Sequence, residues 1–229
     1  MDPTRRQFVQ LGVGSLFLLQ WPRLAWASTA PSCRLSPEQT AGPFYLDDTL
    51  LRQDITDGKP GIPLLLQFEA LDAEGCRPLS GAALDIWHCD AQGAYSGVGA
   101  NEGSRFLRGM QITDGAGRVE FRSILPGYYP GRTNHVHLKL HLGGHIREGH
   151  YLSGWDLHTG QLYFPEPIVR EAMTLPTYRH PGEEWTPQAR DYIFRRQQGE
   201  DSIATLSQAP TGNGLVARLT LVVTTRAPA

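Results

Sequence analysis

The chain has 229 residues, of which 40% are hydrophobic and 19% are charged, as in ordinary globular proteins. Its 25 glycines and 17 prolines favour many turns and short strands and argue against a simple helix bundle. The 21 Lys and Arg residues nearly balance the 23 Asp and Glu residues, so the net charge is −2. Without a basic excess, the sequence predicts no nucleic-acid partner.

The first 27 residues have the features of a targeting segment. Arg5 and Arg6 precede a mostly apolar stretch at 8–19, which is too short to span a bilayer as a helix. The sequence Ala-Trp-Ala at 25–27 fits a cleavage site. We predict a twin-arginine signal peptide over 1–27 and an exported mature domain over 28–229, periplasmic or extracellular and without a membrane segment. The alternative is an N-terminal core helix that begins with two arginines.

Three cysteines lie in the predicted mature domain, and exported proteins can retain disulfides. Cys33 and Cys76 each lie beside turn-like sequence, so they are the pair we expect if a disulfide forms. Cys89 fits better as a small buried side chain. The connectivity of three cysteines does not follow from the sequence alone.

Taken in chain order, alternating or continuous apolar segments predict six strands, separated by turns rich in glycine and proline. These strands lie at 60–71, 82–88, 117–124, 134–142, 160–165 and 214–224. Thr186 followed by Pro187 is typical of a helix start and predicts one helix over 188–198. Short strands at this spacing favour an all-β fold, namely a β-sandwich of short antiparallel strands with long loops and one or two short helices.

The segment at 134–142 carries a pair of histidines that could bind a metal. His135 and His137 are two residues apart, so in a strand they project from the same face. Two imidazoles on a rigid strand are a good platform for a metal ion, and His141 continues the same face as a possible third ligand. Paired histidines also occur in half-buried strands without a metal, so the pair alone is weak evidence.

Tyrosines near these histidines add oxygen donors. Tyr128 and Tyr129 lie in a loop between prolines, and Tyr95 follows the strand predicted at 82–88. Phenolate is a hard anionic donor, so a mixture of phenolate and imidazole suits a hard, high-valent ion better than zinc. The alternative is that these tyrosines pack at the rim of the core with their hydroxyls in water.

Several segments, in order, resemble the intradiol ring-cleavage dioxygenases, the family of protocatechuate 3,4-dioxygenase and catechol 1,2-dioxygenase. The resemblance runs from about 36 to 164 and keeps the family's spacing of eight positions between Trp87 and Tyr95. The matching segments are SPEQTAGPF at 36–44, LDIWHCDAQGAYSG at 84–97, GMQITDGAGRVEFRSILPGYYP at 109–130, Arg132-x-x-His135-x-His137, and GQLYFP at 160–165.

This resemblance implies one Fe(III) per chain, held by four side chains. The implied ligands are Tyr95, Tyr129, His135 and His137. Tyr129 takes the place of the tyrosine that leaves the iron when substrate binds. Arg132 takes the place of the catalytic arginine beside the aromatic ring.

The resemblance also implies roles around the iron ligands. Gly42 and Pro43 are similar to residues that form the wall of the substrate pocket, and Arg132 also faces the substrate. Gln161 is similar to a glutamine placed behind the iron ligands. In this resemblance His141 and Tyr128 are structural residues. His88 has no ligand role in it either.

The implied function is that of a non-haem Fe(III) dioxygenase. Such an enzyme uses O2 to cleave a catechol-type ring between its two hydroxylated carbons, and it gives a cis,cis-muconate-type diacid. The implied partners are a small aromatic diol and O2, and a homo-oligomer is possible. The gap between Tyr129 and His135 is short, and the N-terminal helical dimerisation region of catechol 1,2-dioxygenases is missing. Both departures indicate a small and more open member of this family.

Two other functions fit parts of the sequence. A transthyretin-like β-sandwich module could bind aromatic or cell-wall ligands without chemistry, although it needs no tyrosines, histidines and arginine in this order. A zinc or copper protein could use His135, His137 and His141, although this leaves Tyr95 and Tyr129 without a role.

Overall fold

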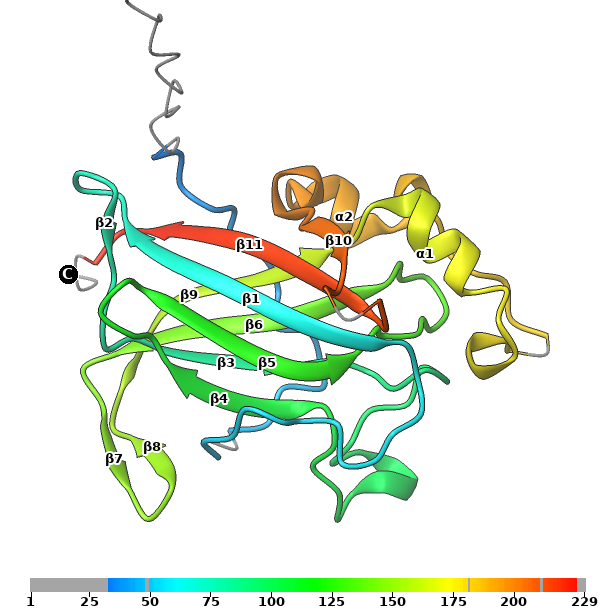
Figure 1. The fold of residues 1–229 in the computed structure, drawn as a ribbon, viewed down its shortest axis with the longest axis horizontal. Coiled ribbons are helices and arrows are strands. Elements are labelled where there is room, and N and C mark those ends of the chain that lie inside the picture. Colours follow the sequence, from blue (N-terminus) through cyan, green and yellow to red (C-terminus); the bar gives the residue numbers. More distant parts are fainter. Residues whose placement is uncertain (1–32, 48–49, 181, 211, 226–229) are drawn as a thin grey trace, which may run out of the picture. The chain divides into compact units, whose positions relative to one another are not determined.

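Two β-sheets packed face to face form the body of the protein (Figure 1). The computed structural model describes residues 33–47, 50–180, 182–210 and 212–225. The predicted signal peptide at 1–27 lies outside these residues. Within the described ranges, no helix is long and apolar enough to cross a membrane.

The first sheet is built around β1 (Pro63–Asp72), which pairs in parallel with β11 (Leu215–Val223). On its other side β1 runs antiparallel to β2 (Arg77–Pro78) and β5 (Arg118–Ile124). β10 (Thr205–Gln208) extends the sheet beyond β11, again antiparallel. The expected antiparallel sandwich is therefore confirmed with one correction, the parallel pair β1–β11.

The second sheet is antiparallel throughout and carries most of the candidate site. Its order is β4 (Arg108–Ile112), β3 (Ala83–Trp87), β6 (His135–Leu142) and β9 (Trp155–Tyr163). Between β6 and β9 the pairing shifts register at Leu140 and His141. The extra residue lies in β9, where Leu157 has no partner on β6.

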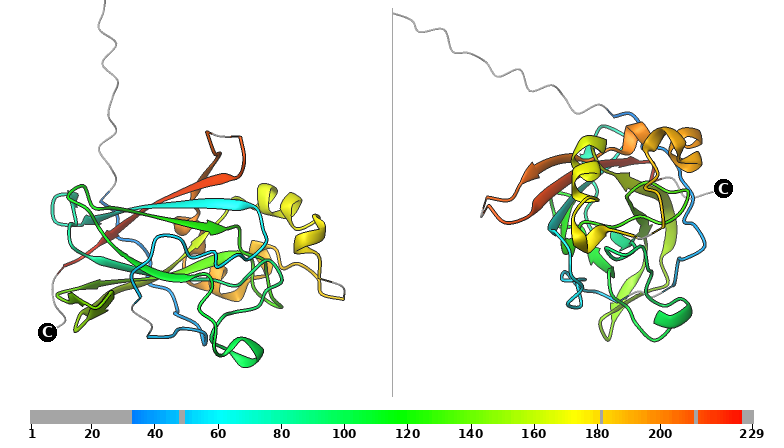
Figure 2. Two further views of the ribbon diagram at one scale, coloured as in Figure 1. Left: turned by 60° about the horizontal axis from the view of Figure 1, so that its bottom comes forward. Right: turned by 90° about the vertical axis from the view of Figure 1, so that its right-hand side faces the viewer.

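Helices and a small hairpin lie at opposite ends of the sheets (Figures 1 and 2). The two α-helices are α1 (Glu166–Ala172) and α2 (Tyr192–Arg196). The hairpin consists of β7 (His145–Arg147) and β8 (His150–Leu152). Single 3-10 turns occur at Gly99–Asn101, Pro176–Tyr178, Gln188–Arg190 and Gly199–Ser202.

The alternation of β6 decides which of its side chains enter the core. Val136, Leu138 and Leu140 belong to the hydrophobic core between the sheets, together with side chains of β1 and β5. The intervening residues face the other way but are also buried, because the N-terminal segment 33–47 crosses that outer face. Lys139, for example, lies over the ring of Tyr45 at 4.0 Å.

All six predicted strands are present, and several further strands were not predicted. β9 begins at Trp155 rather than at 160, and it ends before Pro165. β4 was missed because Gly109 interrupts its apolar pattern. In the structure a Cβ at Gly109 would lie only 2.6 Å from Cγ2 of Ile55, so close packing explains the glycine.

The helix predicted over 188–198 is wrong in its start and in its continuity. A 3-10 turn at Gln188–Arg190 comes first, and α2 then begins after Asp191, not after Thr186. The Asp191 carboxylate accepts hydrogen bonds from two backbone N–H groups in the first turn of α2, at 2.8 and 3.1 Å. The extended backbone of this capping residue separates the two helical turns.

Cys33 and Cys76 form a disulfide, as expected, and Cys89 is buried with a free thiol. The disulfide ties the start of the described chain to the turn before β2. Further along, Gln39 donates its backbone N–H to the Thr159 carbonyl at 2.8 Å. The N-terminal segment 33–47 is therefore fastened to both sheets as it passes over the outer face of β6.

Replacing both bonded cysteines, by Cys33→Ser with Cys76→Ser, should lower the free energy of unfolding by about 2–4 kcal/mol. The reason is that the bond joins residues 43 positions apart and restricts the unfolded chain. Urea unfolding measures the change. Reductant should bring the wild-type midpoint to that of the double variant and leave the variant unchanged, and identical midpoints throughout would contradict this role.

Candidate active site

Two buried histidines of β6 form the centre of the site. The Nε2 atoms of His135 and His137 lie 3.1 Å apart on the outer face of the sheet. The Nδ1 atom of His135 lies 2.6 Å from the Thr133 carbonyl, so Nδ1 carries the proton and Nε2 keeps its lone pair. Burial lowers the pKa of both rings, that of His137 to about 3. Both imidazoles are therefore neutral, as metal ligands must be.

Trp87 and the loop after β3 complete the walls around these rings. The indole of Trp87 stacks on His137, with centroids 5.1 Å apart and nearly parallel planes. The loop closes on itself through Asp90, whose backbone N–H bonds to the Ala94 carbonyl at 2.8 Å. An ion pair of 2.8 Å between Asp90 and Lys59 holds this loop to the segment before β1. Tyr95 follows directly from this fixed loop.

Two tyrosines approach the histidine pair from different loops. The hydroxyl of Tyr129 lies 3.3 Å from Nε2 of His135, and the ring of Tyr95 lies 5.8 Å from that of Tyr129. Tyr95 is only 5% exposed, and its hydroxyl makes no hydrogen bond within the described residues. Burial raises the pKa of both hydroxyls, while the Arg132 guanidinium opposes this rise. The four predicted ligands thus come together in one place.

The chemistry of this donor set fits a hard metal ion. Two neutral imidazoles face each other with a ring-nitrogen separation of 3.1 Å, and two ligand atoms each about 2.1 Å from one ion lie about that far apart. A buried tyrosine hydroxyl without a partner is costly unless something binds it. Two nitrogen and two oxygen donors suit a hard, high-valent ion better than zinc.

His141 does not join this group. Its Nδ1 atom lies 3.1 Å from Oδ1 of Asp156, at the point where β6 and β9 shift register. Among the residues that the structure describes, no cluster of three or more His, Cys, Asp or Glu side chains could hold a metal. These observations argue against a zinc or copper site built from His135, His137 and His141.

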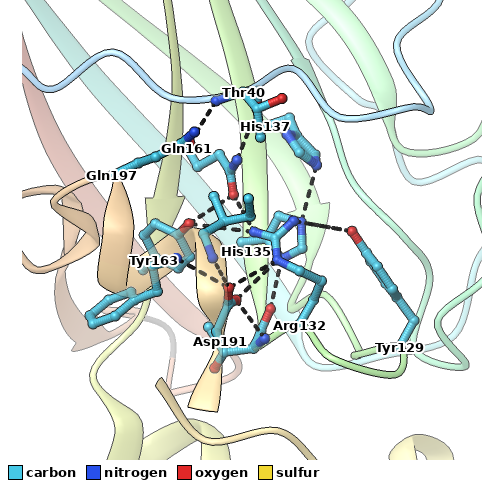
Figure 3. A network of polar contacts seen from close by, with 12 residues as sticks. Thr40, Tyr129, Arg132, His135, His137, Gln161, Tyr163, Asp191 and Gln197 are labelled. Carbon is cyan, nitrogen blue, oxygen red and sulfur yellow. Dashed lines mark hydrogen bonds and ion pairs between the residues drawn. The ribbon is translucent and has the colours of Figure 1, made fainter. Parts of the chain in front are cut away.

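Arg132 is held beside Tyr129 by several partners (Figure 3). Its Nε donates to both Asp191 oxygens, at 3.2 and 3.0 Å, and its Nη2 donates to Oε1 of Gln161 at 2.5 Å. Nη2 also lies 3.4 Å from the Tyr163 hydroxyl. The third nitrogen, Nη1, lies 3.3 Å from the Tyr129 hydroxyl. A positive charge therefore faces the tyrosine edge of the site.

The two residues predicted to form the wall of the substrate pocket, Gly42 and Pro43, differ in their surroundings and in their exposure. Gly42 has a φ of +67°, and a Cβ there would lie 3.2 Å from Cε1 of His137, so the backbone approaches this ring as only glycine allows. Pro43 follows in a turn and is exposed. Gln161 is buried opposite His137 on β9, and its Nε2 donates to the Thr40 carbonyl at 2.9 Å.

Asp191 and Tyr163 are site residues that sequence reasoning missed. Asp191 is fully buried and pairs with Arg132, and Tyr163 donates to Oε1 of Gln161 at 2.9 Å. Asp191 precedes an apolar stretch, which is a signal for a helix cap. No signal in the sequence connects it with Arg132, because the two lie 59 positions apart.

The remaining aromatic residues have local partners. The hydroxyl of Tyr128 donates to the Glu183 carbonyl at 3.2 Å, and its ring stacks on His180 with centroids 4.3 Å apart. His88 lies fully buried between the Cys89 carbonyl, at 2.8 Å, and the Ser123 hydroxyl, at 2.7 Å. Burial lowers its pKa to about 4, so it is neutral. These contacts are consistent with a structural role for both Tyr128 and His88.

Comparison with known proteins identifies the family. A family model described as Dioxygenase matches residues 36–168, which is more than half of the chain. The structure resembles the intradiol ring-cleavage dioxygenase of Tetranychus urticae with a TM-score of 0.76 and 29% identity, over 86% of this chain and 98% of that one. The chain belongs to the intradiol ring-cleavage dioxygenases.

More distant members of the family share parts of the chain. This intradiol dioxygenase family member is 35% identical to the catechol 1,2-dioxygenase of Candida albicans over 95 residues, which are 39% of this chain and 31% of that protein. It is 30% identical to the chlorocatechol 1,2-dioxygenase of Pseudomonas putida over 149 residues, covering 59% of this chain and 56% of that protein. The chain thus spans about a third to about a half of the length of these curated relatives.

Gly42→Ala should disturb the site through the backbone. The positive φ costs about 1–3 kcal/mol for a residue with a Cβ, and the added atom pushes on the His137 ring. Thermal unfolding and metal bound per chain measure the two effects. Gly58→Ala is the matched control, because Gly58 has a φ of +72° with open space around it. Equal metal binding in the two variants would show that contact with His137 is unimportant.

Proposed function

We propose that this protein is a non-haem Fe(III) dioxygenase that cleaves a catechol-type ring between its two hydroxylated carbons with O2. The product would be a cis,cis-muconate-type diacid. The observation that carries the proposal is the meeting of two imidazole nitrogens and two tyrosine hydroxyls beside Arg132. The names of the relatives, which include catechol, chlorocatechol, protocatechuate and hydroxyquinol dioxygenases, support a catechol-type substrate.

One ferric ion per chain would be held by Tyr95, Tyr129, His135 and His137. When bound, Fe(III) supplies Lewis acidity that lowers the pKa of the catechol hydroxyls and draws electron density from the ring, which makes the ring reactive towards O2. His135 and His137 fit as permanent ligands, since both are neutral and fixed on one strand.

The two tyrosines differ in a way that suits different roles. Tyr95 is buried beneath Phe44, with ring centroids 4.5 Å apart, so it is fixed in place. Tyr129 is half-buried and lies in a loop, so it is the tyrosine that can move aside for a substrate. Its phenolic oxygen is placed to accept a proton from a catechol hydroxyl and to hold it near Arg132.

Arg132 would stabilise negative charge on the bound ring. Its Nη1 faces the Tyr129 hydroxyl, where a substrate oxygen would take the place of that hydroxyl. Because the guanidinium is already fixed by its other nitrogens, little reorganisation is needed when charge develops. The non-catalytic transthyretin-like module is disfavoured, since ligand binding alone does not require this arrangement.

We also propose that the mature chain is exported. The paired Arg5 and Arg6 before a short apolar stretch support a twin-arginine signal. The disulfide between Cys33 and Cys76 supports an oxidising compartment, where such bonds persist.

A visible absorption spectrum tests the metal assignment. Protein loaded with Fe(III) should show a charge-transfer band from tyrosinate to iron, and catechol added without O2 should shift it. Tyr95→Phe should weaken the band because one phenolate is lost. Tyr128→Phe should leave it unchanged, because Tyr128 bonds to the Glu183 carbonyl instead. A protein that stays colourless after loading would overturn the ligand set.

Arg132→Ala should lower kcat for catechol cleavage by about 10²–10³-fold while iron stays bound. The reason is that the variant loses the charged donor at the Tyr129 edge but keeps all four ligands. Oxygen uptake and iron content measure the two quantities. Arg190→Ala is the control, because Arg190 pairs with the exposed Glu184. An unchanged kcat in Arg132→Ala would show that the arginine has no part in the reaction.

A further inference from the structure

We propose that Asp191 is a positioning residue for Arg132, so that the short helix α2, which Asp191 caps, is part of the active site. This inference rests on the proposed function, in which Arg132 stabilises charge on the substrate. It concerns a carboxylate that touches neither the candidate ligands nor the substrate. Asp191 would act only through the guanidinium that it holds.

The surroundings of Asp191 fix its carboxylate from two sides. The side chain is fully buried, and its Oδ1 accepts the two N–H groups of the first turn of α2. Its Oδ2 accepts the backbone N–H of Thr133 at 3.0 Å, next to the arginine itself. Both oxygens also accept from Nε of Arg132. The helix and the loop before β6 therefore meet at one charged group.

The other hydrogen bonds of the Arg132 guanidinium show that its contact with Asp191 sets the orientation of Nη1. Nη2 is occupied by Gln161 and Tyr163, so two of the three nitrogens are held. A planar group held by hydrogen bonds at two of its nitrogens cannot turn in its plane. The third nitrogen, Nη1, is thereby directed at the Tyr129 hydroxyl. Without Asp191, Nε of Arg132 would lose its hydrogen bonds, and Nη1 would no longer be directed at the Tyr129 hydroxyl.

The carboxylate comes from a part of the chain outside the family match. The matched segment ends at residue 168, and it contains Arg132, Gln161 and all four candidate ligands. Asp191 and α2 follow later in the chain, and Figure 3 shows Asp191 beside Arg132. The family segment thus supplies the reacting groups, and the later segment supplies the charge that orients one of them.

The other end of α2 is fastened as well. Gln197, directly after the helix, accepts from Nε2 of Gln39 at 2.8 Å through its carbonyl. Its side chain accepts the backbone N–H of Thr40 at 2.9 Å. The helix is therefore anchored to the N-terminal segment 33–47 that carries Gly42. A fixed helix holds the Asp191 carboxylate at a fixed position, which a positioning role requires.

A double-variant cycle on the iron-loaded mature chain tests the inference. Asp191→Asn should lower kcat for catechol about tenfold with KM changed less than about twofold, a smaller loss than for Arg132→Ala. In the Arg132→Ala background the same change should alter kcat less than about twofold, because residues that act as one unit are not additive. A multiplicative loss in the double variant would overturn the inference.

One further variant at this position, Asp191→Glu, separates the role of the charge from that of the helix cap. Asp191→Asn keeps an oxygen that can cap α2, whereas Asp191→Glu keeps the charge, so a role confined to capping predicts that Asn retains more kcat than Glu. The inference predicts the reverse order. Should the Asn variant fail to fold, the same cycle is run with Asp191→Glu. Glu184→Gln, which breaks the exposed pair with Arg190, is the matched control and should keep the wild-type kcat.

Failure of this inference is distinguishable from failure of the proposed function. Iron-loaded wild type without O2 uptake on catechols would overturn the function, and the role of Asp191 with it. Normal turnover by wild type together with wild-type kcat in Asp191→Asn would overturn only the role of Asp191. Denaturant midpoints of the four proteins in the cycle give a second readout. A midpoint loss from Asp191→Asn that persists in full in the Arg132→Ala background would show that the two side chains are not coupled.

Discussion

The pleat of β6 fixes the core and the candidate metal centre together. One face of this strand packs Val136, Leu138 and Leu140 into the core, so the strand cannot shift by one residue without burying its histidines there. The same register therefore fixes His135 and His137 on the outer face. The core and the candidate metal centre are two sides of one strand, and hydrophobic packing supplies the rigidity that the chemistry requires.

Arg132 organises the second half of the site. It joins a loop, β9 and α2 through Asp191, Gln161 and Tyr163, and it leaves one nitrogen directed at Tyr129 (Figure 3). A buried charge of this kind is tolerated because it is paired and fully bonded. The result is a polar network that surrounds the histidines on the side away from the core.

Local patterns in the sequence predicted the strands, and the resemblance to a known family implied the candidate ligand set, but neither predicted the contacts that depend on tertiary structure. Regular alternation located β6 and β1, whereas β4 was missed because Gly109 is explained only by its packing against Ile55. The candidate site residues, all within the 36–168 segment, were predicted because they stand in an order that resembles the family. Asp191 was not found as a partner of Arg132, since a carboxylate at a helix start carries no sign of what it faces across the fold.

The parallel pairing of β1 with β11 has a consequence for how the chain folds. β1 is the first strand of the described chain and β11 is the last, yet they pair along nine residue positions at the centre of one sheet. Such pairing joins segments that are far apart in sequence, and loop closure must be completed before it contributes any stability. A growing chain therefore cannot complete this sheet on the ribosome until β11 has emerged, so the sheet is expected to form slowly and late.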